Sequence, residues 1–166
     1  MSKWLLPILF ICCTVVSCTK SDGGLANYKV QAAKDDKIVT NYIAANGLKD
    51  SAIKVSDTSG AYYIIEQQGQ GNDLYSLSTL VTVGYTCKTL IGQKLIEQTN
   101  QFHPSYTLGQ TILGWQLGLP HINKGGTIRL LLPSRYAYGP YPQPNIGIDT
   151  ANAILDFNIQ VYNITN

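Results

Sequence analysis

The sequence predicts an α+β domain in which an antiparallel sheet is wrapped on one short helix and is preceded by one amphipathic helix. Three observations support this fold class. Several segments alternate between apolar and polar residues, Pro- and Gly-rich connections separate them, and one short helical stretch lies among them. The chain has 166 residues, of which 45% are hydrophobic and 13% are charged. It is therefore long enough to bury a sizeable core in one domain with accessory segments.

The first 17 residues have the pattern of an export signal. Lys3 precedes an almost wholly apolar run at 4–16, which is shorter than the ~20 residues that cross a bilayer. Small or apolar residues at 15–17 then lead into Cys18, which resembles the lipobox of bacterial lipoproteins, although Val15 stands where that motif usually has Leu. We expect 1–17 to be removed and Cys18 to carry acyl chains. The alternative is an ordinary secretory signal in which Cys18 has no role.

A lipidated Cys18 predicts the location of the protein. Two or three acyl chains hold a protein firmly to a bilayer, whereas one chain holds it only marginally. We therefore expect the protein in the envelope of a bacterium, anchored through lipid to the outer membrane and facing the periplasm. The polar, Gly-rich residues 18–26 predict a flexible tether between this anchor and the rest of the chain.

Residues 27–59 are expected to form a leader helix and a linker. No Pro or Gly interrupts 27–46, and Gly47 suits the position just after a helix. The apolar residues near helical spacing are Tyr28, Ala32, Ile38, Val39, Tyr42 and Ile43. Such a helix usually docks its apolar stripe on the neighbouring domain, which we favour here. The alternatives are an arm that joins two copies in a homodimer and a surface that binds a partner.

The remaining elements belong to the main domain, expected at 60–166. Strands are predicted at 61–67, 80–86, 127–133 and 155–162, the last with strict alternation of apolar and polar residues. One short helical piece is predicted near 115–122, where Pro120 limits its length.

Charge and residue usage exclude several classes of function. The net charge is +2 and no basic patch of the kind that nucleic acid requires is present. His103 and His121 lie far apart and lack metal-ligand spacing, so neither a metal site nor a cofactor is expected. Three of the four cysteines lie within the first 18 residues and Cys87 stands alone, which argues against a disulfide framework.

Four segments, in order, resemble the FKBP-type peptidyl-prolyl cis-trans isomerases. They are Val-Thr-Val-Gly-Tyr-Thr at 81–86, Leu-Gly-Gln-Thr-Ile-Leu-Gly-Trp-Gln-Leu-Gly-Leu at 108–119, Pro-Ser-Arg-Tyr-Ala-Tyr-Gly at 133–139 and Asn-Ala-Ile-Leu-Asp-Phe-Asn-Ile at 152–159. Their order and spacing agree with the family over roughly two thirds of the chain. The resemblance implies an FKBP-like fold and an FKBP-type isomerase domain at 60–166.

The activity implied by the resemblance is rotation about X–Pro bonds, which assists the folding of exported proteins. The barrier of about 18–20 kcal/mol arises because twisting the bond breaks amide resonance. A catalyst must bind the twisted amide better than either planar form. A twisted amide has lost charge separation, so an apolar pocket favours it and no cofactor is needed. The implied partners are proline-containing unfolded or exported polypeptides, together with the membrane.

The resemblance also implies the residues of the pocket. Trp115 would form its floor, Tyr85 and Phe157 its walls, and Tyr138 would direct its hydroxyl at the substrate carbonyl. The further substrate-binding residues expected are Thr111, Ile112, Leu95, Ile96, Tyr141 and Ile148. Tyr141 and Ile148 would lie on a Pro-stiffened flap at 140–152.

The sequence departs from the family inside this pocket. Leu95 stands where the family has a phenylalanine, Ile96 where it has an aspartate, and Cys87 where it has a glycine. Without that carboxylate, the Tyr85 hydroxyl needs another partner or a water, since an unsatisfied buried hydroxyl costs about 1–3 kcal/mol.

A further aromatic of the family aligns with Pro104 or Ser105, although Tyr106 or Phe102 could substitute from nearby. These departures support an alternative function, a non-catalytic or weakly catalytic peptide-binding chaperone module with a degenerate FKBP pocket. A third reading is a structural lipoprotein that uses the fold only as a scaffold.

Overall fold

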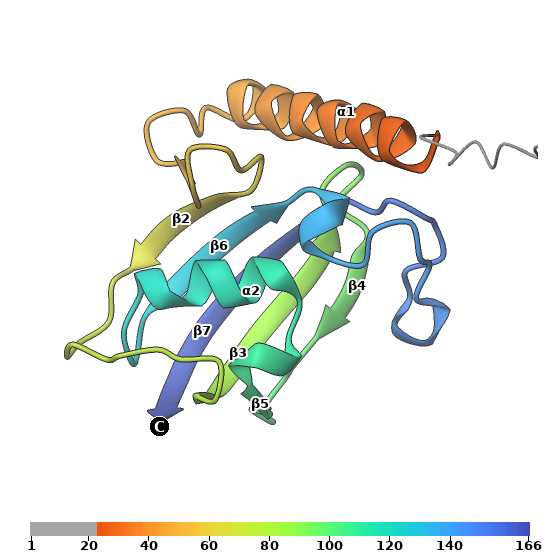
Figure 1. The fold of residues 1–166 in the computed structure, drawn as a ribbon. Coiled ribbons are helices and arrows are strands. Elements are labelled where there is room, and N and C mark those ends of the chain that lie inside the picture. The colour runs from red at the N-terminus through yellow and green to blue at the C-terminus, as the bar shows by residue number, and fades with distance from the viewer. Residues whose placement is uncertain (1–22) are drawn as a thin grey trace, which may run out of the picture.

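The computed structural model describes residues 23–166, in which a seven-stranded antiparallel sheet carries two helices (Figure 1). The helices are α1 (Gly23–Ala45) and α2 (Leu113–Gly118). The strands are β1 (Ile53–Lys54), β2 (Tyr62–Gln67), β3 (Leu80–Thr89), β4 (Leu95–Gln98), β5 (Ser105–Thr107), β6 (Thr127–Leu132) and β7 (Leu155–Thr165). This arrangement confirms the α+β class.

The N-terminal predictions lie largely outside the part of the chain that the structure describes. This holds for the signal peptide at 1–17 and for the lipidation site Cys18. The expected tether at 18–26 is wrong in its last four residues, because α1 begins at Gly23. Within 23–166, no helix is both long and apolar enough to cross a membrane.

The sheet has the order β1-β2-β6-β7-β3-β4, and β5 pairs with the start of β3. β7 is central and pairs with β3 along its whole length, from Leu80 opposite Thr165 to Thr89 opposite Leu155. On its other side β3 is shared by two short strands, β5 near its start and β4 near its end. The four predicted strands are confirmed, with β3 and β7 each three residues longer than expected.

Alternation along β6 and β7 divides the core between the two faces of the sheet. Ile128, Leu130 and Leu132 face one side, which α2 crosses in Figure 1, and all three are fully buried. Leu131 faces the other side, where it packs in a cluster with Val39 of α1. A strand buried on both faces reads as a continuous apolar run, which explains the sequence Leu-Leu-Leu at 130–132.

Two glycines allow α2 to lie close against the sheet. A Cβ atom at Gly114 would overlap the Leu132 side chain, and a Cβ at Gly118 would overlap Leu130. The glycines are four residues apart and therefore share one face of the helix. The helix begins two residues before the predicted start and continues as a 3₁₀ turn at Leu119–His121, which contains Pro120.

The leader helix α1 docks on the main domain, as favoured from the sequence. Val39 and Ile43 are buried against Leu90, Leu131 and Ile154. Homodimerisation through this helix stays a prediction.

Three short strands escaped prediction because each is only two to four residues long: β1, β4 and β5. β1 joins the sheet edge by pairing Ile53 with Tyr63, so the sheet takes in part of the expected linker at 27–59.

Candidate active site

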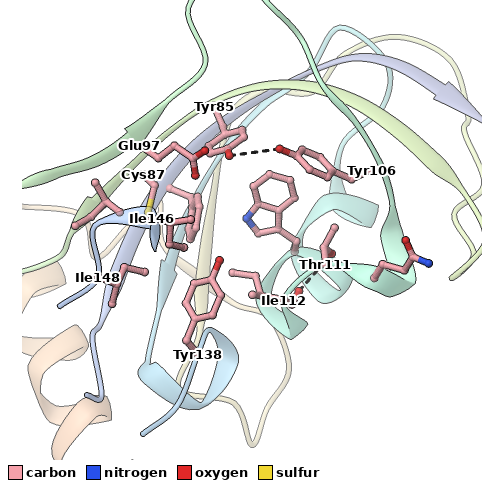
Figure 2. Close-up of a pocket in the computed structure, with 13 residues that line it drawn as sticks. Tyr85, Cys87, Glu97, Tyr106, Thr111, Ile112, Tyr138, Ile146 and Ile148 are labelled. Carbon is pink, nitrogen blue, oxygen red and sulfur yellow. Dashed lines mark hydrogen bonds between the residues drawn. The ribbon is translucent and has the colours of Figure 1, made fainter. Parts of the chain in front are cut away.

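A cavity of about 330 Å³ opens between α2, the strands β3, β4 and β7, and the segment that follows β6 (Figure 2). Its lining residues are Tyr85, Cys87, Ile96, Glu97, Tyr106, Gln110, Thr111, Ile112, Trp115, Tyr138, Ile146, Ile148 and Phe157. Eight of the ten pocket residues expected from the sequence are among them. Leu95 and Tyr141 are the two that are not.

The Trp115 indole is held by three aromatic rings that meet it edge to face. The centroid distances are 5.2 Å to Tyr85, 5.6 Å to Phe157 and 5.8 Å to Tyr106, with interplanar angles of 81–86°. Such tilted contacts are the favoured geometry for aromatic pairs. Trp115 is 5% exposed, and its Nε1–H has no hydrogen-bond partner among the described residues. The indole is therefore a rigid apolar surface.

Strand alternation brings Tyr85 and Phe157 to the same wall. Phe157 of β7 pairs with Cys87 of β3, and Tyr85 lies two residues before Cys87, so all three side chains point to the α2 face. The Tyr85 hydroxyl lies 3.5 Å from the Tyr106 hydroxyl, the contact drawn in Figure 2. Tyr106 thus supplies the additional aromatic, while Phe102, the other candidate, is 77% exposed and lines a neighbouring surface groove.

A shift of register in β4 decides which of its residues enter the pocket. Cys87 pairs with Glu97, whereas Lys88 pairs with Leu95, so Ile96 is the extra residue of a bulge. Ile96 and Glu97 both line the pocket as a result. Leu95 points away and is 51% exposed, so its expected place in the pocket was wrong.

The pocket holds a carboxylate after all. The sequence predicted that Ile96 leaves it without one, but Glu97 extends toward Tyr85 (Figure 2). Burial, with Tyr106 and Glu97 nearby, raises the pKa of Tyr85 far above its usual value. Burial, together with Glu97 and Asp156, raises the pKa of the Cys87 thiol to about 12. Both groups stay protonated at neutral pH, so Cys87 is no nucleophile there.

The segment after β6 forms the opposite wall. Tyr138 follows the 3₁₀ turn Ser134–Tyr136, and its hydroxyl points into the cavity (Figure 2). Burial, followed by the nearby Cys87, Glu97 and Tyr106, raises the pKa of Tyr138, so the hydroxyl remains a donor.

A small hairpin completes this wall. Gln143 and Ile148 exchange backbone hydrogen bonds of 2.7 and 3.0 Å, and Gly147 closes the turn with φ at 81°. Ile146 and Ile148 line the cavity from this hairpin. Tyr141 lies just before this hairpin. Its N–H donates to the Tyr138 carbonyl at 3.3 Å, and its side chain is 70% exposed. The expectation that Tyr141 lines the pocket was therefore wrong.

Thr111 and Ile112 form the rim where the chain enters α2. The Thr111 hydroxyl donates to the Leu108 carbonyl at 2.7 Å, and the Thr111 carbonyl accepts from Gln116 Nε2 at 2.7 Å. Within the described residues, the Ile112 N–H makes no hydrogen bond. It can therefore donate to a bound peptide.

The geometry suits binding of an apolar ring rather than covalent chemistry. The floor and walls are aromatic and aliphatic, and the available donors are the Tyr138 hydroxyl and the Ile112 N–H. In residues 23–166 no group of three or more potential metal ligands comes together. Sequence reasoning missed Glu97, Gln110 and Ile146. Only Ile146 carried a signal, as an apolar residue beside Ile148 on the expected flap.

Comparison with known proteins agrees with this geometry. The family model described as FKBP-type peptidyl-prolyl cis-trans isomerase matches residues 75–162. The chain is 34% identical over 110 residues to the isomerase FkpA of Buchnera aphidicola subsp. Schizaphis graminum, covering 66% of this chain and 42% of that protein. It is 33% identical over 99 residues to FK506-binding protein 1 of Candida glabrata, covering 58% of this chain and 85% of that protein.

Solved structures show the same fold. The crystal structure of FkpA from Escherichia coli superposes with a TM-score of 0.66 at 25% identity, covering 87% of this chain and 65% of that one. The chain spans about half the length of the curated FkpA proteins that it matches, between 41% and 54%.

Proposed function

Because the chain belongs to the FKBP-type peptidyl-prolyl cis-trans isomerases, we propose that it catalyses rotation about X–Pro bonds in unfolded polypeptides. The observation that carries this proposal is the Trp115 indole, held by three aromatic rings in a cavity that the Tyr138 hydroxyl enters. The substrate proline ring would lie on the indole, and the peptide backbone would accept hydrogen bonds at the rim.

The rate increase comes from a difference in solvation. A planar amide has strong charge separation and loses favourable hydration when it enters an apolar cavity. A twisted amide has less charge separation and therefore loses less hydration free energy. The pocket therefore lowers the barrier without a nucleophile. A reduction of about 8 kcal/mol corresponds to roughly a millionfold acceleration. Tyr138 adds a hydrogen bond to the substrate carbonyl.

A proline-limited refolding assay tests the proposal. The chain lacking residues 1–18 should accelerate the slow phase of a model protein that waits on X–Pro isomerisation. Trp115→Ala should abolish the effect because it removes the floor. Tyr138→Phe keeps the ring and should lose about tenfold in kcat/KM, which is less than the hundredfold or more lost with a donor to a full oxyanion.

Tyr141→Ala is the matched control, since Tyr141 is an exposed aromatic of the same loop outside the cavity. It should isomerise at the rate of the parent chain. A folded parent chain that leaves the slow phase unchanged at micromolar concentration would rule out the proposed function.

The alternative of a degenerate peptide-binding module loses its main argument. It depended on Leu95 and Ile96 replacing polar and aromatic groups in the pocket. Leu95 lies outside the cavity, Tyr106 supplies a ring, and Glu97 supplies a carboxylate. We therefore do not adopt it.

We further propose that Cys18 is lipidated, that the protein faces the periplasm from the outer membrane, and that its substrates are exported polypeptides. The apolar run before Cys18 supports this location. Only four residues separate Cys18 from the start of α1, so the anchor would hold the helix near the membrane surface. The mass of the N-terminal peptide from the membrane fraction tests the lipid. A Cys18→Ala chain that stays in that fraction would contradict it.

A further inference from the structure

The leader helix α1 precedes the region that matches the family model, yet it contacts the loop that carries Tyr138. Asp35 of α1 is 1% exposed. Its Oδ2 accepts hydrogen bonds from the Ser134 N–H at 3.0 Å and from the Ser134 hydroxyl at 2.5 Å. Its Oδ1 accepts from Gln31 Nε2 at 2.6 Å. Both carboxylate oxygens are therefore satisfied, as burial of a charged group requires.

Ser134 in turn holds the backbone on both sides of Tyr138. Its carbonyl accepts from the Ala137 N–H at 2.9 Å and from the Gly139 N–H at 2.8 Å. The Gly139 carbonyl accepts from the Asn152 N–H at 2.9 Å, which closes the base of the flap. A chain of hydrogen bonds thus runs from Asp35 through Ser134 to the residues that flank Tyr138.

Asp36 and Arg135, which follow Asp35 and Ser134 in the chain, make a second contact between α1 and the turn. Arg135 Nη2 lies 2.7 Å from Asp36 Oδ1, and Arg135 Nη1 donates to the Ala32 carbonyl at 3.3 Å. A Cβ atom at Gly60 would overlap the Asp36 carboxylate, so only glycine leaves room for the pair. α1 therefore contacts two successive residues, Ser134 and Arg135, of the turn before Tyr138.

We propose that Asp35 is a positioning residue for the isomerase site, acting through Ser134 to hold the Tyr138 hydroxyl at the cavity. The inference rests on the proposed function. Apolar contacts of Val39 and Ile43 already dock the helix, so docking does not by itself require a buried carboxylate. The carboxylate adds a directional contact to one turn, and small displacements of a catalytic group are costly in rate.

A double-mutant cycle tests the route through Tyr138. In the full-length chain kept in mild detergent, Asp35→Ala should lower kcat/KM about tenfold. In a Tyr138→Phe background the same substitution should have little further effect, because the group it positions is gone. Asp35→Asn retains an acceptor oxygen and should restore most of the activity.

Val39→Ala is the matched control. It removes buried methyl groups from the same helix one turn away and loosens docking without breaking the Asp35 contacts. It should leave kcat/KM unchanged. The inference fails if Asp35→Ala is as active as the parent chain, if it loses equally in both backgrounds, or if Val39→Ala loses as much.

Amide hydrogen exchange separates this failure from failure of the proposed function. Asp35→Ala should speed exchange at Ala137 and Gly139 relative to Val39→Ala, whether or not the chain isomerises proline. An inactive parent chain would overturn the proposed function. Unchanged exchange at both amides would overturn the positioning role of Asp35.

Discussion

The Glu97 carboxylate reinforces the effect of burial on the protonation of its neighbours. It lies at the rim beside groups that are neutral when protonated, and its negative charge opposes their ionisation. Burial is the larger cause at Tyr85 and Cys87, and Glu97 adds to it in both cases. The hydroxyl of Tyr138 is affected in the same direction. The pocket therefore keeps its hydrogen-bond donors over the whole physiological pH range.

Glu97→Gln should lower the pKa of Cys87 from about 12 while leaving it above its ordinary value of 9.0, because burial remains. The rate of alkylation by iodoacetamide follows the thiolate fraction, so it should rise at a fixed pH between 8 and 9. The chain lacking residues 1–18 contains Cys87 as its single thiol, which makes the measurement unambiguous.

Asp149→Asn is the control for this measurement, since Asp149 is an exposed acid of the flap that pairs with Lys94. It should leave the alkylation rate unchanged. Equal rates for Glu97→Gln and the parent chain would show that Glu97 does not act on the thiol.

At the scale of the elements, the positions of β4 and α2 relative to the pocket depend on a bulge in the first and on two glycines in the second. The bulge in β4 turns two successive residues into the pocket. The two glycines of α2 let the helix approach β6, which sets the depth of the Trp115 floor.

Gly114→Ala should destabilise the protein by about 1–2 kcal/mol. The added methyl group overlaps the Leu132 side chain, and overpacking outweighs the gain in helix propensity. Urea unfolding at neutral pH measures the difference.

Gly24→Ala in α1 provides the comparison, because a Cβ there would meet no atom within 4 Å. This substitution should be neutral or stabilise by up to about 1 kcal/mol. Equal effects of the two substitutions would contradict the close packing of α2.

On the scale of the whole molecule, polar contacts on the outer face of the sheet join α1 to the central strands. Arg129 of β6 pairs with Asp156 of β7 at 2.7 Å, and the Tyr42 hydroxyl of α1 accepts from Arg129 at 2.9 Å. The apolar core on the opposite face is shared by β3, β6, β7 and α2. This apolar core also contains the Cys87 thiol and the Tyr85 hydroxyl, whose pKa values are raised by burial and which are therefore neutral in the folded state.

This burial predicts loss of stability at alkaline pH. A group whose pKa is raised by folding stabilises the fold below its ordinary pKa, and that contribution is lost as the pH rises to the folded value. For Cys87 the window runs from 9.0 to about 12. The free energy of unfolding should therefore fall above pH 9, with at most about 1.4 kcal/mol per pH unit from this thiol.

Urea unfolding at pH 7, 9 and 10.5 measures the slope. Cys87→Ala should start from a lower stability, because it leaves a small void, but should lose less between pH 9 and 10.5 than the parent chain. Equal losses of stability in Cys87→Ala and the parent chain would show that the thiol ionises as easily in the folded protein as in the unfolded one.

The strands around the pocket were predictable because their signals are local. Alternation along 155–162 follows from strand geometry, in which neighbouring side chains point to opposite faces. Trp115 was identified as the floor only by the combined resemblance of four segments to the family, because the Gly-Trp pair at 114–115 by itself would indicate a core residue. The short strands β1, β4 and β5 carry too few residues for any periodic pattern.

The sequence by itself determined the α+β class and the main strands, because periodicity and composition depend on neighbours along the chain, and its resemblance to the family implied the aromatic pocket. Only the tertiary structure decided that Leu95 faces solvent, that Glu97 supplies the carboxylate and that Asp35 reaches Ser134. The physical reason is that a shift of one residue in strand pairing reverses which side chains face the core. That register, like the contact across 99 positions from α1, is set by partners distant in the sequence.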